Sequence, residues 1–254
     1  RLNPPEITEE VNIIVSTWPA SRWLSEKLSI INNINALVKY PFPGTYLKRL
    51  VKNFIGIDPN EKDPWEKNNL VWNILELLPE LIKNQEAQII KSWLKKNKKE
   101  KDKINISKWD LANSIAEMFD DYILYRPDII KQWVSKKTKR SSGYISANKN
   151  IIWQEILFNL LYEKINKDPF CIQAEKAIKV LKKDDITDLD YPKNLYIYGL
   201  CSLAPLQIDL IQAFSKVINI KIYLISPCND LWQRCETRRL QFRDTWNTPP
   251  DKQW

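Results

Sequence analysis

Residues 118–133 read MFDDYILYRPDIIKQW, a stretch that predicts two helices separated by a proline. Upstream, apolar side chains recur at spacings of four, three and four residues, which is the period of one helix face. These side chains are Leu111, Ile115, Met118 and Tyr122. Pro127 disfavours helical backbone at Arg126, so the first helix should end near Tyr125. Arg126 is therefore expected at a rigid corner.

The opposite face of the first helix carries the carboxylates Glu117, Asp120 and Asp121. Three aromatic residues flank the corner: Tyr122, Tyr125 and Trp133. The simplest interpretation is an amphipathic helix with a solvated acidic face and a packed aromatic end. The alternative is a surface for a polar ligand such as single-stranded nucleic acid, in which arginine contacts the backbone, rings stack on bases and carboxylates accept from base amino groups.

The composition describes a folded protein. Of 254 residues, 44% are hydrophobic and 28% are charged, which is enough to bury a full core. Only four residues are glycine, which favours a largely helical chain over one with glycine-rich phosphate loops. The net charge of +8 permits nucleic-acid binding but does not establish it.

Histidine is absent, and no two cysteines have the CxxC spacing. The sequence therefore argues against a zinc site, and it excludes the Ser-His and Cys-His classes of nucleophilic catalysis. The sequence contains no signal peptide and no apolar run of membrane-spanning length, so we expect a cytosolic chain without a membrane partner. The abrupt ends suggest a fragment of a longer protein.

The pattern along the chain predicts an α/β fold that is predominantly helical. Strands are expected at residues 11–16, 33–40, 194–200 and 220–226, with helices at 22–31, 46–54, 68–83, 150–164, 172–181, 205–217 and 229–246. Pro79 should kink or divide its helix. The β-α-β order near the C-terminal end indicates a parallel sheet. We expect an α/β domain from residues 1–45 and 184–254, interrupted by a helical insertion at 46–183.

The strand and helix near residues 11–31 have the layout in which a phosphate-binding loop would lie, yet the GxxxxGK[ST] motif is absent. The basic segment 91–103 is expected to be a solvated helix end and loop, with a phosphate contact as the alternative. The second basic segment, 131–140, is expected to be a mobile loop. Four arginines cluster within the predicted helix at 229–246, as either a solvated face, a phosphate contact or a subunit interface; they are Arg234, Arg238, Arg239 and Arg243.

Five motifs, taken together, resemble the RecC family, the gamma chain of the ATP-dependent exonuclease V complex RecBCD. They are VSTWPASRWL at 15–24, YPFP at 40–43, WNILELLPEL at 72–81, FDDYILYRPD at 119–128 and YGLCSLAPLQ at 198–207. The resemblance implies an inactive helicase-like, P-loop NTPase-like parallel-sheet domain. Pro19 replaces the family's loop glycine. Gly199 and Leu200 stand where active helicases have acidic magnesium ligands.

The resemblance also implies a function. A RecC-like chain would be a non-catalytic DNA-binding scaffold that guides single strands and reads the Chi sequence during double-strand break repair. Its partners would be RecB-like and RecD-like subunits, single-stranded DNA and duplex ends in the bacterial cytoplasm. ATP and magnesium would be used by those subunits, with no cofactor in this chain. The implied DNA contacts are Ser16, Thr17, Arg22, Phe42, Glu117, Met118, Asp120 and Arg126.

Two alternatives remain. An active nucleotide-driven motor is disfavoured because the phosphate-loop lysine and the strand-end carboxylates are missing. A helical protein-protein interaction scaffold with no direct DNA contact stays open, since the resemblance would then extend only to the framework.

Overall fold

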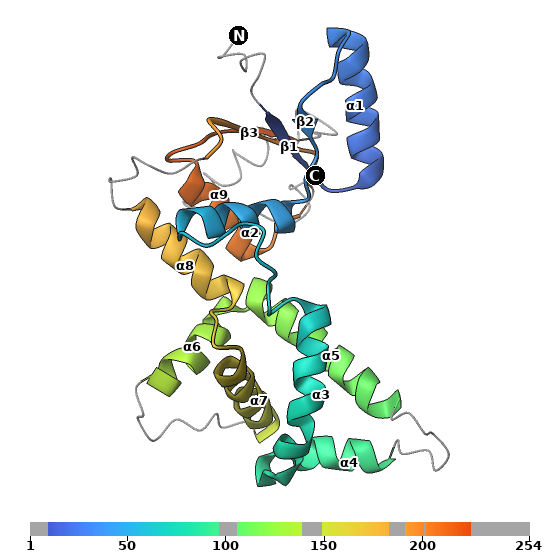
Figure 1. Cartoon of the computed structure of the whole chain (residues 1–254), viewed down its shortest axis with the longest axis vertical. Helices are drawn as coiled ribbons and strands as arrows, with labels where there is room; N and C mark the ends of the chain where they lie inside the picture. The colour runs from blue at the N-terminus through green and yellow to red at the C-terminus, as the bar shows by residue number, and fades with distance from the viewer. Residues whose placement is uncertain (1–9, 97–105, 139–148, 183–190, 201, 225–254) are drawn as a thin grey trace, which may run out of the picture.

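A computed structural model describes residues 10–96, 106–138, 149–182, 191–200 and 202–224. The described residues form a parallel sheet with strand order β2-β1-β3-β4. Its strands are β1 (Val11–Val15), β2 (Val38–Lys39), β3 (Asn194–Tyr198) and β4 (Asn219–Tyr223). The sheet lies at one end of the molecule and helices make up most of the remainder, so the prediction of a mainly helical α/β fold is confirmed (Figure 1).

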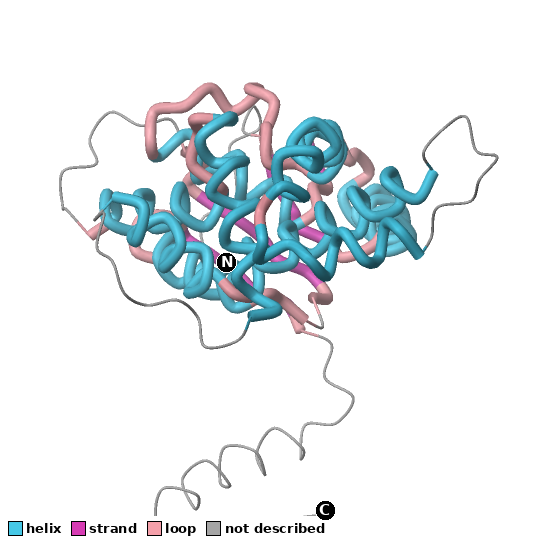
Figure 2. The backbone as a smooth tube through the Cα atoms, turned by 90° about the horizontal axis from the view of Figure 1, so that it is seen from below, coloured by secondary structure: helices cyan, strands magenta, loops and turns pink. Residues whose placement is uncertain are grey.

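The helices occupy both sides of the sheet and the region beyond it, and Figure 2, seen from below, shows many of them in front of the strands. They are α1 (Trp18–Asn32), α2 (Pro43–Phe54), α3 (Lys67–Lys83), α4 (Gln88–Lys96, after the 3-10 turn η1 at Gln85–Ala87), α5 (Ile106–Tyr125), α6 (Pro127–Thr138), α7 (Lys149–Ile165), α8 (Phe170–Leu181) and α9 (Pro205–Phe214). The predicted break is confirmed, because α5 ends at Tyr125 and α6 begins at Pro127.

Four expectations need correction. The strand expected over 33–40 contains only Val38 and Lys39. Pro79 does not divide α3, because the exposed proline is flanked by Leu78 and Leu81, whose burial offsets the lost hydrogen bond. The helix expected from residue 22 begins at Trp18, with a proline in its first turn, where no N–H is needed. The predicted helix at 229–246 lies outside the described residues, as do residues 97–103 of the first basic segment and 139–140 of the second. Residues 131–138 belong to α6, so the loop expected over 131–140 is helical as far as it is described.

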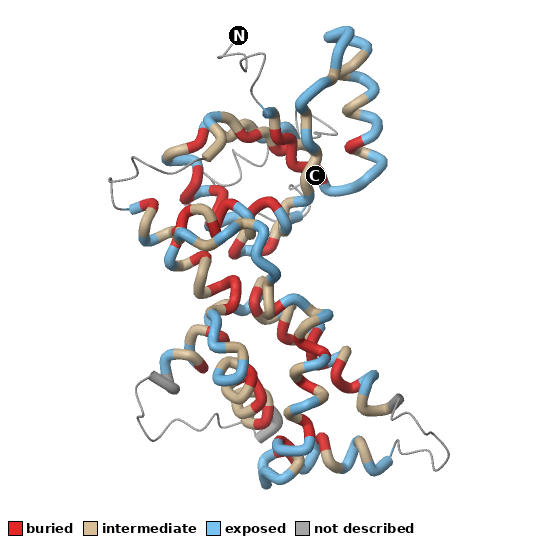
Figure 3. The backbone as a smooth tube through the Cα atoms, viewed as in Figure 1, coloured by how far each residue is buried: buried red, intermediate tan, exposed pale blue. Residues whose placement is uncertain are grey.

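The core lies against one face of the sheet. Ile14 of β1 and Ile197 of β3 are paired in register and are both almost fully buried. They belong to one apolar cluster with Leu47 of α2 and Phe214 of α9. The same cluster continues between the helices farther from the sheet through Phe119 of α5, and Figure 3 shows this buried path in red. The packed side of the molecule is therefore the sheet face covered by α2 and α9, together with the helices behind them.

Helix α1 lies on the other face of the sheet. Successive side chains of a strand point to opposite faces, so Tyr198 points away from the core that holds Ile197. Trp23 of α1 stacks on Tyr198, with ring centroids 6.2 Å apart. Ser21 is the only residue of α1 that is buried, and most of the helix is exposed (Figure 3). We call this the open side.

Within the described part of the chain, no helix combines the length and apolar character needed to cross a membrane.

Candidate nucleic-acid interface

The strand order creates a topological switch point between β1 and β3. From β1 the chain passes through α1 to β2 on one side, and from β3 it passes through α9 to β4 on the other. In open α/β sheets, ligands bind outside the carboxyl ends of the strands at such a point. Ser16 and Thr17 follow β1 directly, so the structure places these two sequence-predicted residues at the switch point.

The turn between β1 and α1 is very short. Only Ser16 and Thr17 lie between the last strand residue and the first helical residue, and both are exposed. Thr17 is the N-cap of α1, and its Oγ1 accepts a hydrogen bond from the Ala20 N–H at 3.3 Å. A phosphate loop needs several more residues of backbone to surround a triphosphate. This turn is thus a helix cap beside a sheet edge.

Two exposed rings meet beside that turn. The Val15 N–H donates to the Pro41 carbonyl oxygen at 3.1 Å, which ties the end of β1 to the chain leaving β2. As a result, Trp18 and Phe42 face each other edge to face, with centroids 6.1 Å apart and an interplanar angle of 79°. Trp18 is 70% exposed and Phe42 is 37% exposed. Sequence reasoning identified Phe42 but missed Trp18, although Trp18 stands in the 15–24 motif between the predicted contacts Thr17 and Arg22.

Arg22 lies one turn beyond Trp18 on α1 and is exposed. Within the described residues it makes no ion pair, so its guanidinium is available to a ligand. Together, Arg22, Trp18 and Phe42 place a cation one helical turn from a pair of exposed rings. This is the combination that binds single-stranded nucleic acid through phosphate contact and base stacking.

The second group of predicted residues lies on α5. Glu117 is exposed, and its carboxylate pairs with the Lys67 ammonium of α3 at 3.5 Å. Met118 is partly buried and packs against the core. Met118 is therefore a less accessible contact than Glu117.

Asp120 is half-buried, contrary to the expectation of a fully solvated acidic face. Burial raises the pKa of its carboxyl, and the neighbouring carboxylates of Asp121, Asp63 and Glu66 act in the same direction. The ammonium of Lys48 opposes this rise. Asp120 therefore sits where a hydrogen-bond donor or a positive charge would be favoured.

Lys48 is a second residue that sequence reasoning missed. It lies on α2 and pairs with Asp63 at 3.1 Å. Six residues separate it from Phe42, which corresponds to about 9 Å along a helix. Helix α2 thus runs from the first group of candidate residues to the neighbourhood of the second. Only tertiary structure could reveal this, because Lys48 and Asp120 are far apart in sequence.

Arg126 stands at the predicted corner and is exposed. It does not turn toward the carboxylates of α5. Its Nε and one terminal nitrogen instead donate to the two carboxylate oxygens of Asp128, at 3.2 and 3.1 Å. This contact holds the pKa of Asp128 below its usual value. Of the flanking rings, Tyr125 is exposed, whereas Trp133 is only 2% exposed and belongs to the core.

The structure thus gathers Ser16, Thr17, Arg22 and Phe42 at the sheet edge, and Glu117, Met118, Asp120 and Arg126 along α5 and its end. No hydrogen bond or ion pair joins the two groups within the described ranges. Within the part of the chain that the structure describes, no three acidic, cysteine or histidine side chains are grouped so that they could hold a metal ion.

Comparisons with known proteins agree with the motifs. The profile of the RecC N-terminal domain matches residues 1–254. A protein of Haemophilus influenzae named RecBCD enzyme subunit RecC is 22% identical over 94% of this chain and 23% of its own length. Proteins of the same name from Escherichia coli and Mycolicibacterium smegmatis are 25% and 23% identical over 91% and 89% of this chain.

The chain spans about a fifth of the length of these relatives, 23%, 20% and 19% respectively. The family profile nevertheless extends over the whole sequence, including both groups of candidate residues. The chain therefore belongs to the RecC family and corresponds to its N-terminal domain.

Proposed function

We propose that this chain is a non-catalytic, DNA-guiding part of a RecBCD-like helicase and exonuclease complex. It would contact single-stranded DNA near duplex ends, read Chi during double-strand break repair in the bacterial cytoplasm, and assemble with RecB-like and RecD-like subunits. ATP and magnesium would be used by those subunits. The names of the relatives support the complex, and the two groups of candidate residues support the DNA contact.

One observation carries the proposal: the accessible Trp18–Phe42 pair beside Arg22 at the carboxyl edge of the sheet. Base stacking on an aromatic side chain contributes about 1–3 kcal/mol per base. Exposed rings otherwise cost solvation free energy, so a stacking ligand gives them a physical reason to be there. The nearby guanidinium supplies the phosphate contact.

The same edge supports a helicase-like sheet domain without nucleotide chemistry. The β1–α1 turn has two residues where a phosphate loop needs more, and Gly199 rather than a carboxylate follows β3. An active motor would need both a lysine-bearing loop and a strand-end acid. We infer a P-loop NTPase-like framework whose ligand site now faces DNA.

On α5, the carboxylates of Glu117 and Asp120 would accept hydrogen bonds from base amino groups. Arg126 would contact a phosphate or base, in exchange for its contact with Asp128. These interactions carry sequence information, whereas stacking at Trp18 is sequence-tolerant. The sheet-edge group would therefore supply affinity for single-stranded DNA, and the α5 group would distinguish one DNA sequence from another.

The test is fluorescence anisotropy of labelled single-stranded oligonucleotides at several salt concentrations. Trp18→Ala should weaken binding about tenfold, the loss of one stacked base. Trp72→Ala is a matched control, because Trp72 is 65% exposed and forms a similar edge-to-face pair with Trp109 at 5.0 Å, on helices away from the sheet. Equal losses in the two variants would refute the assignment.

A second candidate function, a protein interaction scaffold without DNA contact, is favoured by the apolar surface of α1 and the loop after it. Four side chains there are at least half exposed: Ile30, Ile31, Ile34 and Leu37. If oligonucleotides fail to bind at low salt while a RecB-like subunit is still captured, and Ile31→Lys abolishes that capture, this second function replaces the first.

A further inference from the structure

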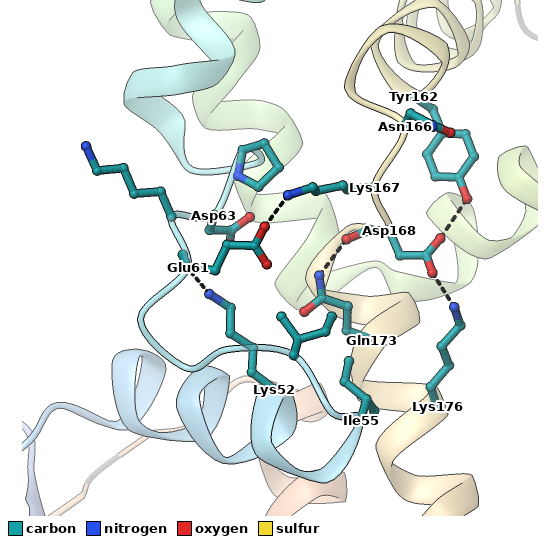
Figure 4. A pocket seen from close by; sticks show the side chains of 13 residues that line it. Lys52, Ile55, Glu61, Asp63, Tyr162, Asn166, Lys167, Asp168, Gln173 and Lys176 are labelled. Carbon is teal, nitrogen blue, oxygen red and sulfur yellow. Dashed lines mark hydrogen bonds and ion pairs between the residues drawn. The ribbon is translucent and has the colours of Figure 1, made fainter.

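The chain passes twice between the helices under the sheet and the helical region α3–α7, and the two crossings lie side by side. The indole N–H of Trp65, before α3, donates to the Lys167 carbonyl oxygen, after α7, at 2.8 Å. Trp65 also stacks on Phe158 with centroids 5.1 Å apart. A pocket of about 520 Å³ opens beside these crossings, lined by both of them and by α2 and α8 (Figure 4).

Lys52 of α2 is an unusual residue in the wall of this pocket. It is only 9% exposed, and its ammonium donates to the backbone carbonyl oxygen of Glu61. In the described part of the chain no carboxylate pairs with it. An ammonium has three N–H donors, and a buried cation without a counter-charge is costly. Lys52 therefore lacks a negative partner at the edge of an open space.

The other two lysines labelled in Figure 4 are already neutralised. Lys167 reaches across the pocket to the carboxylate of Glu61, and Lys176 contacts the carboxylate of Asp168. The ion pair of Lys176 therefore requires the ionised form of the Asp168 carboxyl.

Asp168 is held in its ionised form. Burial raises the pKa of Asp168, but hydrogen bonds from Lys176 and from the Tyr162 hydroxyl, the latter at 2.7 Å, outweigh that effect and leave the pKa below its usual value. Among the lining lysines, Lys62 is exposed to solvent, so the buried positive charge without a carboxylate partner is that of Lys52.

We propose that this pocket binds a phosphate group at Lys52. A phosphate offers several acceptor oxygens to the remaining ammonium donors, and charge-assisted hydrogen bonds of this kind are short and strong. Gln173, whose side-chain amide already donates to the Asp168 carbonyl oxygen at 2.7 Å, lies in the same wall. The phosphate would come either from a small free anion or from the backbone of single-stranded DNA. This site does not depend on the contacts proposed at the sheet edge.

The proposal makes a specific prediction for Glu61, namely that removing its charge strengthens phosphate binding. Its carboxylate lines the same pocket, where it pairs with Lys167, and it would repel an incoming phosphate. Neutralising it by Glu61→Gln removes that repulsion and releases Lys167 as a second donor. The variant should therefore bind phosphate several-fold more tightly than the wild type.

The experiment is thermal unfolding of the 254-residue chain in sodium phosphate and in sodium chloride of equal ionic strength. Phosphate at ten times its dissociation constant should raise the wild-type Tm by about 4 °C over chloride. Lys52→Met should abolish this difference, and Glu61→Gln should reach it at lower phosphate concentration. Lys27→Gln, an exposed lysine of α1, is the matched control and should respond like the wild type.

Equal Tm values in phosphate and chloride for the wild type would overturn the proposal without any variant. So would a full phosphate response in Lys52→Met, or a weaker one in Glu61→Gln. If Lys52→Met does not fold, the wild-type comparison and the Glu61→Gln titration still decide.

Oligonucleotide binding separates the two sources of phosphate. A roughly tenfold weaker anisotropy signal in Lys52→Met would identify the DNA backbone as the ligand. Unchanged oligonucleotide binding, together with the lost Tm shift, would identify a small phosphate-bearing molecule. Either result stands apart from the Trp18→Ala test, because Trp18 contacts Phe42 at the N-terminal end of α2, whereas Lys52 lies near the C-terminal end of that helix.

Discussion

Helices α1 and α9 have the same place in the topology, since each connects two parallel strands of one sheet, yet they are buried very differently. Half of α9 is buried, including Leu206, Leu210 and Phe214. In α1 only Ser21 is buried, while Trp23, Ile30 and Ile31 are exposed. Helices α2, α5 and α8 pack against α9, whereas the main neighbour of α1 is β1.

The difference shows that a connecting helix is stabilised by what packs behind it and not by its place between two strands. The packed side supplies the apolar burial that holds the fold together. The open side contributes little stability, and it carries accessible rings and an available guanidinium. The contacts proposed at the sheet edge thus lie apart from the burial that stabilises the fold.

The largest loss of stability should come from a substitution on the packed side. Phe214 is fully buried and its ring lies 5.1 Å from that of Phe54, so Phe214→Ala should lower the free energy of unfolding by about 3–5 kcal/mol. Trp23→Ala on α1 should cost about 1 kcal/mol, mainly the stacking on Tyr198. Urea unfolding measures both. Similar losses would mean that α1 is as well anchored as α9.

Replacing Asp120, also on the packed side, should change the free energy of unfolding by a smaller amount and in the opposite direction, toward greater stability. Because burial raises the pKa of this carboxyl above its ordinary value of 3.8, the folded state binds more protons than the unfolded state near that pH. Wild-type stability should therefore fall as the pH rises through the two pKa values. Asp120→Asn removes the cost of ionisation, so the variant should be more stable at pH 7 and show no gain at pH 3.

Urea unfolding at a series of pH values would measure the Asp120→Asn effect. Asp209→Asn on α9 is the control, because Asp209 is exposed, and its effect should stay within about 0.5 kcal/mol at every pH. A gain that is the same at pH 3 and pH 7 would show that packing, and not ionisation, distinguishes the Asn variant.

The smallest effect on stability belongs to the open side. Arg22→Ala should change the free energy of unfolding by less than about 0.5 kcal/mol, because nothing in the described structure holds its guanidinium. The same substitution should lower oligonucleotide affinity and reduce the slope of log affinity against log salt by about 1. If stability falls while the salt slope is unchanged, the separation of the proposed contacts from the stabilising burial is wrong at this residue.

Local rules predicted much of this fold. The break at Pro127, the end of α5 at Tyr125 and the β-α-β order at the C-terminal side follow from backbone restriction and hydrophobic period, which act over a few residues. Pro79 was expected to kink or divide α3, and it does not divide the helix, because a local penalty is outweighed by the burial of its neighbours. Whether this proline interrupts the helix depends on tertiary packing, and the hydrophobic period of the sequence gives no information about that packing.

The candidate sites were less predictable, since they depend on residues that are distant in sequence. The Trp18–Phe42 pair forms only because β1 and β2 are neighbours, and the link from Lys48 to Asp120 needs α2 placed next to α5. The unpaired ammonium of Lys52 could not be anticipated at all, because its isolation is a property of the surrounding pocket.

The hydrogen bond between Trp65 and Lys167 has a consequence for how such chains change over time. These residues are 102 positions apart, yet the chain leaves and returns at one spot. A segment whose ends meet can be lengthened, shortened or replaced without moving its attachment points. We therefore expect the stretch from α3 to α7 to be exchangeable. Transplanting the matching stretch of another family member, with the α5 surface that meets α9 retained, should leave the sheet intact.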